Sequence, residues 1–354
     1  MTPVRQRLSE RPRPRLFFIC GSINQTTQMH QIARELDDCD ASFSPYYGDN
    51  VLRRMRKLGL VEFSIGGNRL RARCLEYLLG HGLDIDLDGA RGGYDLVFTC
   101  SDVVVPSNVR GRPLVLVQEG ITDPENILFP LVRRFPTLVP RWLAGTAATG
   151  LSGLYDRFCV ASEGYREHFV ARGAPRERVV VTGMPNFDNC RKFLDNDFPH
   201  RHYVLVCTSD ARETLKLDSR TRFLEHALRI AAGRPLIFKL HPNEHVERAT
   251  REILAMAPTA QVFSSGPTES MIANCDVLIT QFSSVVFVGL ALGKQVHSHY
   301  PLEVLQPLVP DQHGRAARNI AAVARELLSL GPRQARSERS GTPIRLPIAQ
   351  GEVA

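Results

Sequence analysis

The chain has 354 residues, of which 43% are hydrophobic and 23% are charged. This is globular composition, which excludes a disordered or fibrous chain, and the length favours two domains. The formal net charge is +7, and much of the excess lies in arginine-rich ends that we interpret as solvated tails. Because no nucleic-acid-binding motif accompanies this charge, we do not expect nucleic acid as a partner.

The cysteines and the apolar runs indicate the cellular compartment in which the protein is expected. The eight cysteines are scattered with no CxxC pair, as expected of small buried residues in a reducing compartment. The apolar run at residues 16–20 is too short for a signal peptide, and no run is long enough to span a bilayer. We expect a cytoplasmic protein, and peripheral contact with the inner membrane stays open.

The chain opens with a strand, a glycine and a helix. Residues 15–20 (RLFFIC) form a buried strand pattern, Gly21 follows at once, and a helix is predicted from Thr26 or Thr27 to about Asp37. This order is common at the start of a doubly wound α/β domain.

Two further buried strands are predicted at residues 95–99 (DLVFT) and 113–117 (PLVLV). They deliver Asp102 and Glu119 to their carboxyl ends, where ligands bind in such sheets. Glu119 is the candidate acid or base, since partial burial in a cleft mouth would tune its pKa. Asp102 could hold a sugar hydroxyl. For both residues, helix or loop capping is an equally good interpretation.

Residues 127–143 (ILFPLVRRFPTLVPRWL) mix three prolines with large apolar side chains and arginines. Such proline spacing excludes one long helix. Two interpretations stay open: an interfacial segment that holds a lipid acceptor near a membrane, or a buried irregular connection.

A strand, helix and strand unit at residues 157–182 closes at Gly183, and the sequence then turns polar, so we place the interdomain linker near residues 186–202. The second half repeats the alternation of strands and helices. We therefore predict two Rossmann-like, doubly wound α/β domains that face a cleft. The predicted divisions are a disordered lead-in (1–14), an acceptor-side domain (15–190), a donor-binding domain (191–330) and a disordered tail (331–354).

Two motifs in the second half suit a phosphate. Ser283 and Ser284 precede a helix that follows a strand, where the first N–H groups can bind an anion. In KLHPNE, Lys239 and His241 are two residues apart and so project from one face of a strand, and Pro242 biases the backbone before it towards an extended form. A cation and an imidazole there would stabilise a phosphate leaving group. A helix cap and a surface histidine are the structural alternatives.

With these motifs in place, the chain resembles the GT-B superfamily of nucleotide-sugar enzymes over residues 15–330. The resemblance rests on five segments, ICGSINQTTQMHQIARELD, VLVQEGI, FCVASEGYREHFVARGAPRERVVVTGMPNFD, FKLHPNE and CDVLITQFSSVVFVGLALGKQV. It covers surface-polysaccharide glycosyltransferases with HP and SS motifs and UDP-N-acetylglucosamine 2-epimerases. The resemblance implies that His241, Ser283 and Ser284 hold the nucleotide phosphate. It adds Gly21, Gly183 and Thr208 to the donor-binding set.

The departures from these families are specific. Sialyltransferases carry two acids and a glycine where this chain has Gln118, Glu119 and Gly120, so only Glu119 is available as general base. Epimerases have HVEAG where this chain has LVQEG. Their basic first loop is Ser22 to Gln25 here, and their HRREN stretch is 208–213 (TSDARE) here.

We therefore expect a metal-independent, inverting glycosyltransferase. It would move a sugar from a nucleotide-activated donor to a saccharide or lipid-linked acceptor in surface-polysaccharide or glycoconjugate synthesis. The donor is a substrate, and no cofactor is expected. The alternatives are a 2-epimerase-like isomerase, a CDP-glycerol-type glycerophosphotransferase and a non-catalytic nucleotide-sugar binder.

Overall fold

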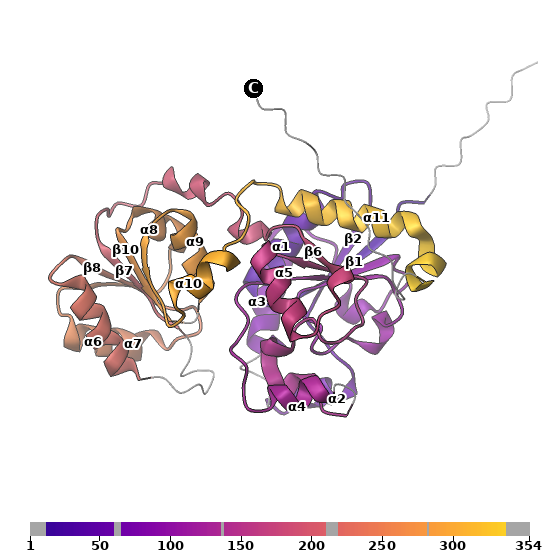
Figure 1. The fold of residues 1–354 in the computed structure, drawn as a ribbon, viewed down its shortest axis with the longest axis horizontal. Helices are drawn as coiled ribbons and strands as arrows, with labels where there is room; N and C mark the ends of the chain where they lie inside the picture. The colour runs from indigo at the N-terminus through magenta and orange to yellow at the C-terminus, as the bar shows by residue number, and fades with distance from the viewer. Residues whose placement is uncertain (1–11, 60–64, 136–137, 210–218, 282, 338–354) are drawn as a thin grey trace, which may run out of the picture.

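The computed structural model describes residues 12–59, 65–135, 138–209, 219–281 and 283–337, with the side chains of the last helix up to residue 330. It contains two α/β units, each built on a parallel sheet with helices packed against it (Figure 1). The predicted fold class is confirmed. No helix among the described residues is both long and apolar enough to cross a membrane.

The first sheet has six parallel strands in the order β2-β1-β3-β4-β5-β6. Alternate residues of β1 enter different cores: Leu16 and Phe18 pack into one apolar cluster, and Phe17 and Ile19 into another. Burial on both faces explains why these strands read as continuous apolar runs. The bounds are β1 Arg15–Cys20, β2 Asp40–Pro45, β3 Leu96–Thr99, β4 Leu114–Val117, β5 Arg157–Val160 and β6 Val179–Val181.

The second sheet has five parallel strands in the order β11-β10-β7-β8-β9. One of its faces belongs to the cluster that contains Phe17 and Ile19, so this core continues from one unit into the other. The bounds are β7 Val204–Cys207, β8 Leu236–Lys239, β9 Gln261–Phe263, β10 Val277–Thr280 and β11 Gln295–His297.

Strand order reverses at one place in each sheet, between β1 and β3 in the first and between β7 and β10 in the second. In open parallel sheets, ligands bind outside the carboxyl ends of the strands at such switch points. The residues after β1 and β3 and after β7 and β10, with those after the neighbouring strands β4 and β8, therefore mark the place to look for a site.

The helices predicted after Gly21, within residues 157–182 and after Ser284 all form. The main helices are α1 Ile23–Arg34, α2 Asn50–Lys57, α3 Asn68–Gly80, α4 Phe129–Arg134, α5 Glu163–Arg172, α6 Arg220–Ala231, α7 Val246–Met256, α8 Thr268–Asn274, α9 Val285–Ala291, α10 Leu302–Leu305 and α11 Ala316–Ser337. Strand β2 and helix α2 were not predicted. Helix α1 starts earlier than expected because Ser22 caps it, its side chain accepting a hydrogen bond from the Gln25 N–H over 3.2 Å.

Helix α11 lies over the first unit although it follows the second in sequence (Figure 1). Its side chains Ile320, Val323 and Leu327 pack into the same cluster as Leu16 and Phe18. The assignment of all residues 191–330 to one domain is therefore wrong for this helix. The predicted tail from residue 331 also begins inside the helix, which continues to residue 337.

The chain returns to the first unit through a contact with the linker. The Asp188 carboxylate accepts hydrogen bonds from the N–H groups of Gly314 (2.5 Å) and Ala316 (2.7 Å), at the start of α11. Carboxylates are favourable at helix N-termini, since they satisfy free N–H groups and oppose the positive end of the helix dipole. Asp188 thus joins the segment that leaves the first unit to the segment that returns to it.

Candidate functional site

Glu119 follows β4 at the carboxyl edge of the first sheet, and its half-buried carboxylate faces the turn between β1 and α1. The Ser22 hydroxyl donates to Oε1 over 2.6 Å, and the Gln25 side-chain amide donates to Oε2. Burial raises the pKa of Glu119, and the hydrogen bonds from Ser22 and Gln25 oppose this rise. The group is thus a fixed carboxylate with increased basicity, as a general base requires.

Ser22 and Gln25 were missed by the sequence analysis, which placed the helix start at Thr26 or Thr27. The signal was present, since a serine after a glycine turn is a strong helix cap. Gly21 lies beside them, and a Cβ at this position would come within 1.9 Å of Gln25 Oε1. Gly21 therefore makes room for the side chain that holds Glu119, and the structure gives it no other contact with the site.

His241 lies two residues beyond β8, and its ring orientation is defined by the loop. The ring Nδ1 accepts a hydrogen bond from the Asn243 N–H over 3.2 Å, which places the proton of the neutral ring on Nε2. An Nε2–H group is a donor, as contact with a phosphate oxygen requires.

The His241 loop is built on Glu244, a residue that the sequence analysis did not single out. Its buried carboxylate accepts from the His241 N–H over 2.9 Å, from the Thr208 hydroxyl, and from the Arg220 guanidinium in an ion pair. Thr208 also accepts from the His241 N–H over 3.1 Å. Thr208, predicted to bind the donor, is therefore fully engaged in positioning His241. The sequence signal was the carboxylate three residues after His241, a spacing that closes a turn.

Lys239 does not accompany His241 as predicted. Its buried ammonium donates to the carbonyls of Leu240 (2.9 Å) and Ser264 (3.4 Å), between β8 and the end of β9. Burial lowers the pKa of Lys239. Pro242 accepts at its carbonyl from Arg69 (3.3 Å) and Arg73 (3.4 Å) of α3, so this loop is joined to the first unit.

Ser284 makes a further contact between the two units. Its hydroxyl oxygen accepts from the Ile121 N–H over 2.9 Å, and a Cβ on Gly120 would approach it to 2.3 Å. Ser284 begins α9 but makes no side-chain capping bond to it. Ser283 is half-buried, and its carbonyl accepts from the Val286 N–H over 3.2 Å. The segment after Glu119 and the start of α9 are thus in direct contact.

Asp102 and Gly183 lie apart from this group. Asp102 is completely buried, and its carboxylate accepts from the N–H groups of Gly150 and Ser152, each over 3.0 Å. It caps a loop and is not exposed to a sugar hydroxyl. Gly183 has φ +82°, and a Cβ there would lie 2.9 Å from the Ala316 Cβ, so this glycine admits the start of α11. We remove both residues from the candidate site.

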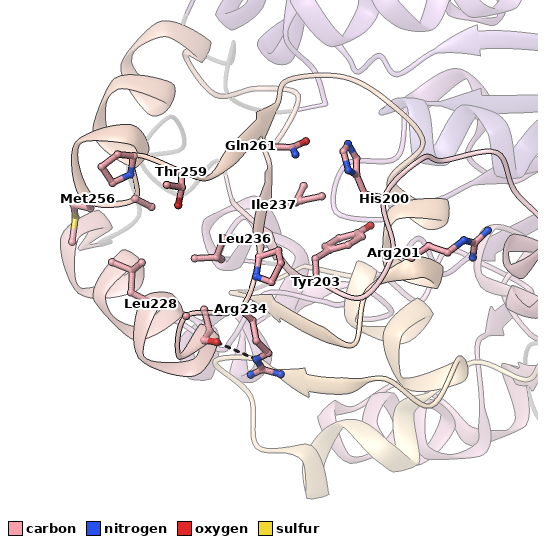
Figure 2. Close-up of a pocket in the computed structure, with 15 residues that line it drawn as sticks. His200, Arg201, Tyr203, Leu228, Arg234, Leu236, Ile237, Met256, Thr259 and Gln261 are labelled. Carbon is pink, nitrogen blue, oxygen red and sulfur yellow. Dashed lines mark hydrogen bonds between the residues drawn. The ribbon is translucent and has the colours of Figure 1, made fainter.

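A hollow lies at the other edge of the second sheet. It has a volume of about 650 Å³ and is lined at the amino ends of the strands by Tyr203, Leu236 and Gln261 (Figure 2). Arg234 at its rim donates to the Ala231 carbonyl over 3.0 Å. Because His241 and Ser284 follow the carboxyl ends of their strands, this hollow is separate from them.

Across the parts of the chain that the structure describes, no group of three or more histidine, cysteine or acidic side chains could hold a metal ion. The candidate site therefore consists of Glu119 with its two donors on one side, and His241 and Ser284 on the other.

Comparisons with solved structures place this geometry in a known fold. The wall teichoic acid polymerase TagF, solved with CDPG, matches with a TM-score of 0.53 at 11% identity over 90% of each chain. The UDP-GlcNAc 2-epimerase of Methanocaldococcus jannaschii, solved with UDP-GlcNAc and UDP, matches with a TM-score of 0.51 at 13% identity over 90% of this chain and 94% of that one. The chain has the GT-B fold.

Anabaena HepE in complex with UDP has the same architecture, with a TM-score of 0.50 at 14% identity over 92% of this chain and all of that one. No protein-family model matches the sequence, and no curated protein matches it. The GT-B resemblance predicted from the motifs is thus confirmed as a likeness of fold.

Proposed function

We propose that this protein is a metal-independent, inverting glycosyltransferase that uses a nucleotide-activated sugar. The contact between Ser284 and the Ile121 N–H carries the proposal. It joins the helix start that suits a phosphate to the segment that begins with Glu119. A donor bound by its phosphate at His241 and Ser284 would therefore present its sugar towards the Glu119 carboxylate.

In the proposed reaction, one proton moves to Glu119 and one electron pair leaves with the nucleotide. Glu119 takes the proton of the acceptor hydroxyl while the oxygen of this hydroxyl attacks the anomeric carbon of the donor sugar. The bond from this carbon to the phosphate oxygen breaks, and the nucleotide leaves with the electron pair. The Nε2–H group of His241 and the amides at the start of α9 would stabilise the developing charge. Ser22 and Gln25 would keep Glu119 aimed at the acceptor.

Fold neighbours support a nucleotide ligand. HepE was solved with UDP, the M. jannaschii epimerase with UDP-GlcNAc and UDP, and TagF with CDPG. Donors of this kind share a diphosphate, which matches the pairing of an imidazole with a helix start. The acceptor we propose is a saccharide or a lipid-linked saccharide.

The first experiment is a thermal-shift panel of CMP, CDP, UDP and GDP. A ligand at about 100 times its dissociation constant stabilises the folded state by about 2.7 kcal/mol, which is a measurable shift. We expect one nucleotide diphosphate or monophosphate to stabilise the protein and His241→Ala to abolish the effect. Stabilisation by none of them at high concentration would overturn the proposal.

The second candidate is a 2-epimerase-like isomerase, and the geometry of Glu119 favours it equally for proton removal from a sugar carbon. The two reactions differ in whether the sugar takes up deuterium from the solvent. Incubation with UDP-N-acetylglucosamine in D₂O introduces deuterium at C2 if the enzyme is an epimerase, and a transferase leaves C2 unlabelled. If CDP alone stabilises the protein, a CDP-glycerol donor becomes the one to test for turnover.

A further inference from the structure

Residues 127–135 and 138–142 belong to a small lobe of the first unit. Helix α4 packs Phe129 and Val132 against Ala144, Ala147 and Ala148 of the 3₁₀ helix Arg141–Ala148, in a cluster separate from the main cores. In Figure 1, α4 lies at the end of the unit opposite α11. A buried irregular connection is one of the two interpretations of this segment from the sequence. It accounts for only some of the apolar side chains of the segment.

Five other large apolar side chains of the lobe face solvent. Ile127 is 95% exposed, Leu138 is 80% exposed and the one tryptophan, Trp142, is 52% exposed. Leu131, on α4, and Phe135, which follows this helix, are exposed as well. Single exposed apolar residues need no explanation, whereas five large ones within 16 residues indicate an interaction surface. We call these five residues the lobe surface.

The charged side chains within residues 127–143 are all arginines. Arg133 and Arg134 are exposed on α4 and Arg141 is half-buried, and residues 127–143 contain no Asp or Glu. The Arg134 guanidinium lies 5.5 Å from the Phe135 ring centre. Amphipathic elements that carry Trp, Phe and Leu beside arginine bind at the boundary between headgroups and acyl chains of anionic lipid.

We propose that the lobe surface binds the anionic face of a lipid bilayer. A second copy of the chain is the competing occupant, and charge argues against it. A two-fold interface would bring Arg133 and Arg134 of both copies together, and residues 127–143 supply no carboxylate to pair with them. Glu125, which precedes the segment, is paired with Arg172. An anionic headgroup supplies that charge, and the acyl region accepts Ile127, Leu138 and Trp142.

The lobe is held firmly enough to dock the whole unit. The Arg172 guanidinium of α5 lies 5.6 Å from the Phe129 ring centre and 3.2 Å from the Glu125 carboxylate. The Asn126 side chain donates to the Leu143 carbonyl over 2.9 Å, so the loop that leads from Glu119 is fixed to the lobe. If the proposed function is correct, a bound membrane would present a lipid-linked acceptor on the Glu119 side.

The test is co-sedimentation of the full chain with vesicles of phosphatidylcholine alone or with phosphatidylglycerol added. We expect binding to the anionic vesicles only, weakened by salt. The variant Ile127→Asp/Leu138→Asp should lose at least about tenfold in affinity, since two apolar anchors are removed and two repelling charges are added. Arg133→Glu/Arg134→Glu should lose at least as much through charge alone. All four positions are exposed, so both variants should keep the melting temperature of the parent.

The matched control is Leu79→Asp/Val304→Asp, which adds the same charges at residues that are 69% and 51% exposed outside the lobe. It should bind anionic vesicles as the parent does. Three results would overturn the proposal: no preference for anionic vesicles, equal loss in the control, or conversion of a dimer to a monomer by the lobe variants in sedimentation. None of these readouts depends on transferase activity, so failure of the proposed function would leave this test intact.

Discussion

The Ser284 hydroxyl oxygen accepts a hydrogen bond over 2.9 Å from the Ile121 N–H, which lies 163 positions earlier in the chain. The contact needs Gly120, because a Cβ at that position would come within 2.3 Å of the same oxygen. The glycine after the candidate base is therefore explained by close approach of the second unit.

Gly120→Ala should destabilise the protein by about 1–3 kcal/mol, the usual cost of overpacking. In a Ser284→Ala background the nearest atom is gone, and the cost should fall by about 1 kcal/mol. A double-mutant cycle in denaturant measures this coupling. Gly80→Ala is the control, since a Cβ at Gly80 meets nothing within 4 Å, and it should not destabilise. Strict additivity of the two changes would show that the contact is absent in solution.

Glu244→Leu should be among the most destabilising changes in the second unit, by about 3–5 kcal/mol, because Arg220 would lose its partner in a buried ion pair. Nucleotide stabilisation in the thermal-shift assay should disappear with it, since the His241 loop loses its support. Glu252→Gln is the matched control. Its carboxylate lies 4.0 Å from Arg220 and is 34% exposed, so the change should cost less than about 1 kcal/mol.

Glu119 should give the stability of the protein an unusual pH dependence. Burial raises the folded-state pKa of Glu119 above its unfolded value, so the folded state binds the proton more tightly. The contribution of this group to stability is therefore full below the unfolded pKa and is lost as pH rises through the folded pKa. Glu119→Gln should remove this loss and be more stable than the parent at neutral pH, while turnover falls at least about 100-fold.

The activity profile gives a second readout for Glu119. Since a general base acts when deprotonated, kcat/KM should rise with pH through a midpoint above the usual range of a glutamate. Urea unfolding at several pH values and the pH profile of turnover measure the two effects. A Glu119→Gln variant that keeps full turnover would remove Glu119 from the mechanism, and an unchanged pH dependence of stability would contradict its burial.

Helix α11 should be part of the first unit. Ile320 is completely buried among side chains of the first sheet, so Ile320→Ala should cost about 2–5 kcal/mol. Arg318→Ala, on the exposed side of the same helix, should cost less than about 0.5 kcal/mol. Chemical denaturation with hydrogen exchange would show whether the loss falls on β1 and β3. Loss confined to strands β7 to β11 would return α11 to the second unit.

The sequence by itself determined the local elements and the strand ends. Continuous apolar runs predict buried parallel strands because both faces of such a sheet are covered, and the polar residues that follow them, Glu119 and His241, are found by position alone. The glycine turn after β1 and the strand, loop and helix around Ser284 were recognisable for the same reason. The short strand β2 (DASFSP) was missed because its polar residues hide the apolar pattern.

Only the tertiary structure decided which residues meet. Helical periodicity shows that α11 has an apolar side, but it does not show which sheet covers that side. In the structure, α11 returns to the first unit and packs against its sheet. The two-residue spacing of Lys239 and His241 predicts one strand face, yet a buried ammonium needs acceptors, and Lys239 finds them in the backbone carbonyls of Leu240 and Ser264. Ser22 and Gln25 reach Glu119, and Glu244 reaches Thr208 and Arg220, only when separate segments are brought together. No local pattern encodes these contacts.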